Sequence, residues 1–178
     1  MKNRILTLFA LAMLMISMPA LIGAAPGEHH HSDKRPVIDW NSYPADIQAL
    51  KIQLDNIKTE QKSLFEQMKA QHDQIRDARN ALSSDQRNTL KDPAKQLILQ
   101  MKTTRDEIHA LRSQKHEAWD SFYDHSAKKQ WSSAKSDLQT VINQKQQIIV
   151  KQKSIVKLQN QLITLIKPTT QMHIHSEE

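Results

Sequence analysis

The chain has 178 residues, a formal net charge of +6 at pH 7, two glycines and no cysteine. Phosphate-binding loops, dinucleotide-binding turns and nucleophile elbows need glycines at fixed offsets, and the last glycine in this chain is Gly27. Kinase, GTPase, Rossmann and α/β-hydrolase functions are therefore excluded. The lack of cysteine likewise excludes disulfides, thiolate nucleophiles, iron–sulfur clusters and cysteine zinc sites.

The N-terminal segment is typical of a secretory signal peptide. Lys2 and Arg4 precede an apolar stretch, which small residues follow. We expect cleavage after Ala24, so that residues 1–24 are removed and the net charge falls from +6 to +4. The alternative is an uncleaved membrane anchor, since the apolar stretch is about long enough to span a bilayer. In both cases we expect the rest of the chain outside the cytoplasm: secreted, periplasmic or associated with the cell envelope. If the segment is cleaved, we expect no stable membrane span.

The mature chain divides by composition into a central region with apolar periodicity and two terminal regions without it. We expect a flexible lead-in at residues 25–43, a helical domain at residues 44–167 and a disordered tail at residues 168–178.

The first long helix is predicted to start near Pro44, a favoured first-turn residue. From Ile47 to Leu82, apolar residues recur at heptad spacing, interrupted by Gln61 and Gln71. This pattern indicates one continuous amphipathic helix.

The second long helix is predicted to start at Pro93. Ser83, Ser84 and Asp85 prefer caps over helix interiors, and the residues after them suffice for one short turn. Asp92 followed by Pro93 is a favoured cap and first-turn pair, after which the heptad spacing resumes.

The third long helix is predicted from Trp131 to Lys167, because Pro168 cannot continue it. Adjacent apolar pairs recur along it every seven residues, which widens the apolar stripe as in a helix that packs against two neighbours. The pairs are Val141 and Ile142, Ile148 and Ile149, Ile155 and Val156, and Leu162 and Ile163.

These elements predict an all-α fold: an elongated, coiled-coil-like antiparallel bundle of three long helices, with room for a short extra helical turn. Short turns between long helices favour the antiparallel arrangement. A slender monomer would be marginally stable, because the gain from apolar burial is similar in size to the entropy lost on folding. We therefore expect a homodimer.

Charge is unevenly distributed along these helices. Residues 45–82 carry six basic and six acidic side chains, and residues 93–125 carry five of each. Residues 131–167 instead carry six lysines against one acidic residue. The sequence therefore predicts a basic surface on the third helix, formed by Lys151, Lys153 and Lys157, that attracts acidic polypeptides or anionic envelope polymer. The alternative is a solvated face whose lysine stems cover apolar surface.

The aromatic residues are predicted to converge at one end of the bundle, where the first helix starts and the second turns into the third. They are Trp40, Tyr43, Trp119, Phe122, Tyr123 and Trp131. One interpretation is a hydrophobic plug that seals the bundle end. The other is an apolar surface on which a partner binds, with Trp119, Phe122 and Trp131 as contact residues.

No arrangement of side chains indicates catalysis, so we assign no catalytic residue and expect no enzyme activity. Nucleic-acid binding is not expected either, because the net charge is modest. The terminal segments hold histidines that are candidate ligands for Zn²⁺, Ni²⁺ or Cu²⁺, with plain polar tails as the alternative and no other cofactor expected. They are His29, His30, His31, His173 and His175.

The segment Leu82-Ser83-Ser84-Asp85-Gln86 resembles the LTxxQ signature of the Spy/CpxP-type envelope-stress family, with serine in place of threonine and no second copy. The resemblance implies an extracytoplasmic, ATP-independent chaperone or a stress and metal sensor that dimerises into a curved helical cradle. It also implies that Leu82, Ser83 and Gln86 form a structural corner, where serine and glutamine tie a helix break together.

From these features we expect a non-enzymatic, extracytoplasmic, chaperone-like protein that holds client polypeptides on an amphipathic helical surface. One alternative is a structural coiled-coil spacer or cell-envelope-associated protein. Another is a metal-responsive stress protein that uses its histidine-containing tails.

Overall fold

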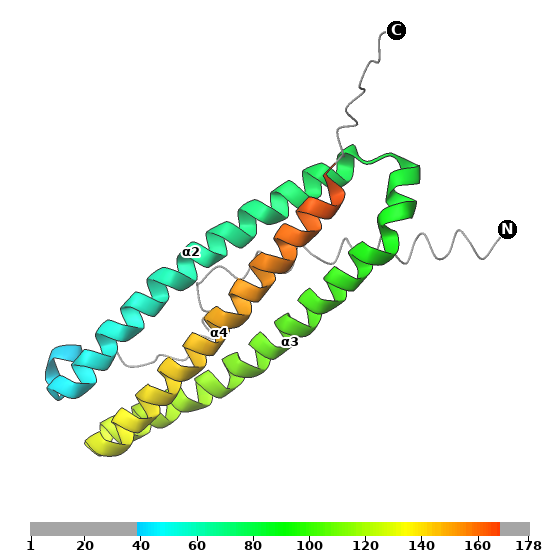
Figure 1. Ribbon diagram of the computed structural model, residues 1–178. Coiled ribbons are helices and arrows are strands. Elements are labelled where there is room, and N and C mark those ends of the chain that lie inside the picture. Colours follow the sequence, from blue (N-terminus) through cyan, green and yellow to red (C-terminus); the bar gives the residue numbers. More distant parts are fainter. Residues whose placement is uncertain (1–38, 168–178) are drawn as a thin grey trace, which may run out of the picture. The chain divides into compact units, whose positions relative to one another are not determined.

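The computed structural model describes residues 39–167, and 93% of this part is helical. It contains a short 3-10 helix, η2 (Trp40–Ser42), and three long helices, α2 (Ala45–Ala81), α3 (Ser84–Ala127) and α4 (Trp131–Ile166). Successive long helices run antiparallel (Figure 1), and residues 39–167 include no strand. The predicted all-α bundle of three long helices is therefore confirmed. The predicted signal peptide and tail lie outside the described residues.

The helical domain begins slightly earlier than expected, because η2 forms within the predicted flexible lead-in. The Asp39 side chain accepts a hydrogen bond from the Asn41 backbone N–H at 3.1 Å and so caps this turn. The Trp40 ring lies 5.5 Å from that of Tyr43 and 5.9 Å from that of Phe122 on α3. Aromatic packing thus holds the start of the domain against the bundle end.

Helix α4 packs along both α2 and α3, whereas α2 and α3 do not pack along each other (Figure 1). This arrangement explains the adjacent apolar pairs of α4, because one row of each pair can face each neighbour. Ile148 and Ile155 belong to a core cluster with Ile108 of α3, against which Met68 of α2 also packs. All eight members of the four pairs are buried, as expected for a helix with two neighbours.

The predicted start of the second helix at Pro93 is wrong. Helix α3 begins at Ser84, and Ser83 is its N-cap. The Ser83 hydroxyl accepts from the Gln86 backbone N–H at 3.3 Å, and the Gln86 side-chain Oε1 accepts from the Ser83 backbone N–H at 2.9 Å. This reciprocal capping box outweighs the weaker start signal at Asp92 and Pro93. Together with the buried Leu82, it forms the corner between α2 and α3.

Pro93 lies inside α3 and changes the direction of the helix. Its ring removes one backbone N–H donor and crowds the preceding turn. Figure 1 shows the first turns of α3 set at an angle to the rest of the helix. The short extra turn that the sequence allowed is therefore the first part of α3.

The turn from α3 to α4 is a Schellman motif built without glycine. The Gln130 N–H donates to the His125 carbonyl at 2.9 Å, and the Lys129 N–H donates to the Ser126 carbonyl at 3.0 Å. Such motifs place a left-handed residue after the helix, usually glycine. Here Lys129 has that conformation, with φ at 55°.

Replacing Lys129 with glycine is expected to raise the free energy of unfolding by about 1 kcal/mol, because a left-handed conformation costs non-glycine residues about that much. Urea denaturation measures the change. Lys128→Gly is the matched control, since Lys128 has φ at −86°, and it should not stabilise the protein. Equal effects of the two variants would contradict this explanation.

Candidate functional site

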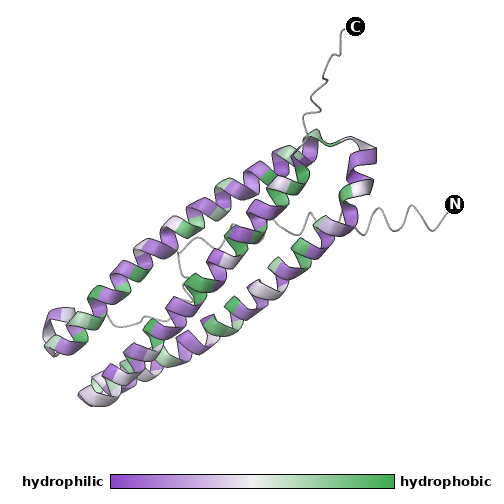
Figure 2. Ribbon diagram, viewed as in Figure 1, coloured by the Kyte–Doolittle hydropathy of each residue, from purple (hydrophilic) through white to green (hydrophobic). Residues whose placement is uncertain are grey.

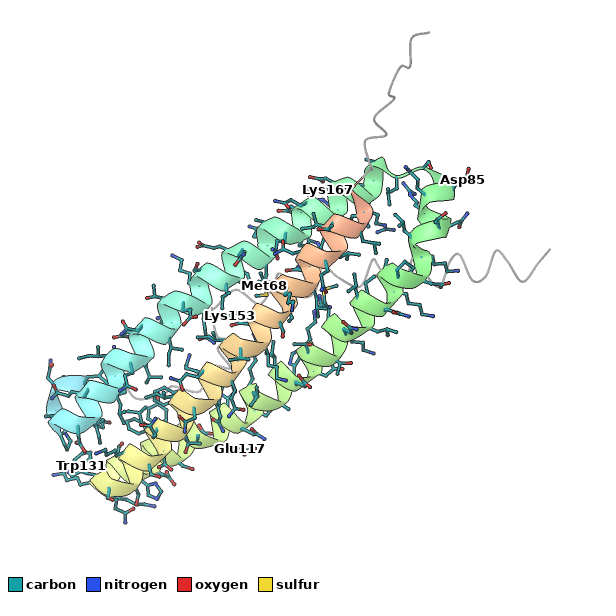
Figure 3. All side chains as sticks on the ribbon, viewed as in Figure 1. Met68, Asp85, Glu117, Trp131, Lys153 and Lys167 are labelled. Carbon is teal, nitrogen blue, oxygen red and sulfur yellow. The ribbon has the colours of Figure 1, made fainter. Side chains whose placement is uncertain are left out.

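The inner face of α4 carries a central polar row between its apolar pairs. This row consists of Lys145, Gln152 and Gln159, spaced seven residues apart. The Lys145 ammonium donates to Gln61 Oε1 on α2 at 3.2 Å. Gln159 Nε2 donates to the backbone carbonyl of Met68 at 3.3 Å. Figure 3 labels Met68 between α2 and α4. Because each bond joins specific positions of two helices, the polar row fixes the register of α4 against α2.

Several buried glutamines keep a carbonyl oxygen without a hydrogen-bond partner in the described part of the chain. They are Gln71, Gln152 and Gln159. Gln71 uses its amide nitrogen to donate to Asn160 Oδ1 at 2.8 Å, but its oxygen stays unpaired. An unpaired buried acceptor costs about 1–3 kcal/mol. The bundle interior therefore holds more acceptors than its own donors satisfy.

The six aromatic residues that the sequence placed at one end do meet there, with Phe122 at the centre. The Phe122 ring lies 5.8 Å from that of Tyr43 and 5.5 Å from that of Trp119, and its side chain is fully buried. Trp131, at the start of α4 (Figure 3), lies edge-on to Tyr43 at 5.5 Å. Phe122 has no surface to offer a partner, whereas the other five rings, including those of Trp119 and Trp131, are half-buried.

The three candidate lysines of α4 do not share one surface. Lys151 forms an ion pair with Glu107 on α3 at 2.7 Å. Lys153 pairs with Glu60 on α2, also at 2.7 Å (Figure 3 labels Lys153). Lys157 is exposed and has no ion pair within residues 39–167. Two of the predicted binding lysines therefore connect α4 to its two neighbours.

Reversing the charge of Lys153 tests this connection. Lys153→Glu sets two carboxylates opposite each other, and we expect the free energy of unfolding to fall by about 0.5–1 kcal/mol. Adding Glu60→Lys restores the pair with opposite polarity and should recover most of the loss. Lys157→Glu is the control, with no measurable change expected in thermal unfolding. A single variant at Lys153 that melts like the wild type would show that the pair contributes nothing.

Mostly basic residues form one row along α2 and one row along α3. Each row lies on the side of its helix that makes no ion pair with α4. Residues seven positions apart share one side of a helix, and Glu60 and Glu107 occupy the opposite flanks, beside α4. We call the two sets the basic rows. On α2 the row is Lys51, Lys58, Phe65, His72 and Arg79, and on α3 it is Lys91, Ile98, Arg105, Arg112 and Trp119. Most of these residues are half-buried, and neither row contains a carboxylate.

The two rows are electrostatically coupled. Burial lowers the pKa of His72 below its ordinary value of 6.5, and the positive charges of Arg76 and Arg105 lower it further. The negative charge of Asp73 opposes this effect without cancelling it. Burial also lowers the pKa of Arg105 and of Arg112. The positive charge of Arg105 on α3 thus acts on His72 of α2.

The lowered pKa of His72 makes stability depend on pH. In the unfolded chain His72 binds a proton near its ordinary pKa of 6.5, whereas the folded chain binds it only at lower pH. The free energy of unfolding should therefore fall as the pH decreases from about 7.5 to about 5.5. His72→Gln should show a smaller fall in urea titrations over this range, because the other histidines are unchanged. A larger fall in the variant would contradict the direction of this pKa shift.

Among the basic residues of the two rows, Lys51 alone forms a salt bridge within residues 39–167, with Asp55. Its ammonium also lies 5.7 Å from the Trp40 ring centre. The long guanidinium side chains of Arg105 and Arg112 have no carboxylate partner in the described part of the chain. Most basic residues of the rows thus form no salt bridge within residues 39–167, which sequence analysis missed because total charge on α2 and α3 is balanced.

Apolar residues do not form a comparable surface in the described part of the chain. The large exposed apolar side chains there are Ile52, Leu99 and Val150, one on each long helix. In Figure 2 hydrophilic and hydrophobic residues alternate along all three helices. None of the helices described here has the length and apolar character that crossing a membrane requires. The basic rows are thus the strongest candidate for a binding site.

The candidate metal ligands His29, His30, His31, His173 and His175 lie outside the described residues. Within residues 39–167, no group of three or more histidine, aspartate or glutamate side chains is arranged to hold a metal ion. Binding of Zn²⁺, Ni²⁺ or Cu²⁺ by the terminal segments stays a prediction.

Comparison with protein-family models, with curated proteins and with solved structures found no match. The resemblance of Leu82, Ser83 and Gln86 to the Spy/CpxP-type signature therefore stays a prediction.

Proposed function

We propose that this protein is a non-enzymatic binding protein that works outside the cytoplasm and holds acidic or unfolded polypeptides on its helical surface, as a chaperone does. One observation carries the proposal: α2 and α3 each carry a row of mostly basic residues without a carboxylate, on the side that makes no ion pair with α4. Lysines of α4 engage acidic residues of α2 and α3, such as Glu60 and Glu107. The opposite flanks keep the basic rows, which lack carboxylates.

This charge distribution suits capture of a client without ATP. A field of one sign attracts an acidic client over long range and raises the rate of encounter. Half-buried apolar members of the rows, such as Phe65 and Trp119, offer contact once the client is close. Because the electrostatic attraction and the apolar contact each contribute little per residue, we expect binding to be reversible.

Suppression of aggregation is the direct test of this function. The full mature chain should reduce light scattering from an acidic test protein that is heated or reduced, in the absence of ATP. The effect should weaken at about 0.5 M salt, where the Debye length is well below its value of ~10 Å at 0.1 M. No suppression at several-fold molar excess, at low salt, would overturn the proposal.

A second candidate is a structural spacer at the cell envelope, favoured by the length of the helices. At 1.5 Å per residue, the 37 residues of α2 and 44 residues of α3 span about 55 and 65 Å. The basic rows would then lie on anionic envelope polymer or lipid headgroups. Salt-sensitive sedimentation with anionic liposomes, without suppression of aggregation, would favour this function over the first.

We also propose that the protein is a homodimer. The motivation is the limited core that three slender helices provide. Size-exclusion chromatography with light scattering measures the mass directly, and a monomeric mass at micromolar concentration would contradict the proposal.

A further inference from the structure

We propose that the basic rows of α2 and α3 bind an acidic amphipathic helix of a partner polypeptide, which lies along them as a fourth helix. This inference rests on the proposed function and names the class of client that the surface recognises.

The first support is the arrangement of the helices. Both α2 and α3 pack along α4, but they do not pack along each other. In a four-helix bundle each helix has two neighbours, whereas here α2 and α3 have one long helical neighbour each in the described part of the chain. A fourth helix along the basic rows would supply the second neighbour to both.

The second support is the spacing of the arginines. Arg105 and Arg112 are one heptad apart, which on a helix corresponds to about 10.5 Å. Carboxylates one heptad apart on a facing helix have the same spacing. A guanidinium can hold a carboxylate through two parallel hydrogen bonds. Burial lowers the pKa of both arginines in the isolated chain, and a paired carboxylate would reverse that effect.

The third support is the mixture of residue types within each row. Phe65 lies among basic residues on α2, Trp119 ends the α3 row, and both are half-buried. A helix with apolar residues flanked by carboxylates complements this mixture, whereas a uniformly charged polymer leaves the apolar members unused.

The interior beneath these rows is also incompletely satisfied. The central polar row of α4 lies between the apolar row that faces α2 and the one that faces α3. Gln152 in this row is 7% exposed, and its carbonyl oxygen has no hydrogen-bond partner in the described part of the chain. Buried acceptors of α2 and α4 thus lack partners within residues 39–167.

Other occupants fit less well. A second copy of the chain would bring its own basic rows against these, and like charges repel. A phosphate polymer would be attracted by positive charge at any spacing and would not require the apolar residues. We therefore assign the surface to an acidic helix.

Isothermal titration calorimetry of the full mature chain with two peptides tests the assignment. One peptide of about 28 residues carries leucines in a heptad seam flanked by glutamates, and the other has the same composition in scrambled order. Polyphosphate serves as a third ligand. We expect the patterned peptide to bind about tenfold or more tightly than the scrambled one.

Two double variants locate the site. Arg105→Gln with Arg112→Gln should weaken binding of the patterned peptide about tenfold or more, because two charge-assisted contacts are lost. Lys157→Gln with Lys167→Gln removes the same charge from exposed positions on or next to α4 and should change the affinity by about twofold or less. Circular dichroism verifies that both variants keep the helical fold.

The outcomes separate this inference from the proposed function. Equal binding of both peptides overturns the fourth-helix assignment and leaves acidic-polypeptide binding standing. Tighter binding of polyphosphate than of the patterned peptide overturns the assignment in favour of an anionic polymer. Failure to bind either peptide, together with failure to suppress aggregation, overturns both proposals. Equal losses in the two double variants overturn the location of the site.

Discussion

Replacing Phe122 with alanine is expected to lower the free energy of unfolding by about 3–5 kcal/mol, the range for truncating a large buried aromatic side chain. Phe122 is fully buried, and its ring lies within 5.9 Å of the rings of Trp40, Tyr43 and Trp119. The loss is a large fraction of the stability of an ordinary domain, about 5–15 kcal/mol.

Urea denaturation and near-ultraviolet circular dichroism measure this effect. The tryptophan signal should change in the folded variant, because Trp40 and Trp119 lose a ring neighbour. Phe65→Ala is the matched control: Phe65 is half-buried and outside the cluster, so it should cost less and leave the tryptophan signal unchanged. A loss below about 1 kcal/mol for Phe122→Ala would contradict the plug.

Replacing Gln152 with leucine is expected to raise the free energy of unfolding by about 1–2 kcal/mol. The change removes a buried carbonyl oxygen that has no hydrogen-bond partner in the described part of the chain and adds apolar surface among buried isoleucines. Gln152 therefore lowers the free energy of unfolding relative to an apolar residue at this position. Such a cost is common at positions kept for specificity or binding.

Gln161→Leu is the control for this substitution, since Gln161 lies on the exposed face of α4. Its effect in urea denaturation should stay within about 0.5 kcal/mol. A destabilised Gln152→Leu protein would contradict the account, because it would mean that the amide oxygen is satisfied, for example by a buried water.

Much of the fold follows from local pattern. The heptad spacing from Ile47 predicted α2, and the adjacent apolar pairs predicted that α4 packs against two neighbours. The start of α3 was predicted wrongly, because two start signals compete within ten residues. The capping box at Ser83 satisfies two backbone N–H donors at once, while Pro93 can be tolerated inside a helix that bends.

The candidate site was harder to predict, because charge totals conceal how charge is arranged around a helix. Six basic and six acidic residues on residues 45–82 cancel in a sum. In the structure Glu60 lies beside α4, whereas Lys58 and Arg79 lie in the α2 row. The lysine excess of α4 predicted a binding surface there instead, although Lys151 and Lys153 form ion pairs with neighbouring helices. Which flank faces which helix is set by tertiary packing.

Nuclear magnetic resonance of the arginine side chains tests most directly whether the basic rows carry the binding. The full mature chain, labelled with ¹⁵N, is titrated with an acidic polypeptide at low salt, and the Nε–Hε signals are followed. The account predicts saturable shifts for Arg105 and Arg112, with no comparable shift for Arg87, which lies in the first turn of α3 and outside the rows. Unchanged Arg105 and Arg112 signals while the polypeptide binds would contradict it.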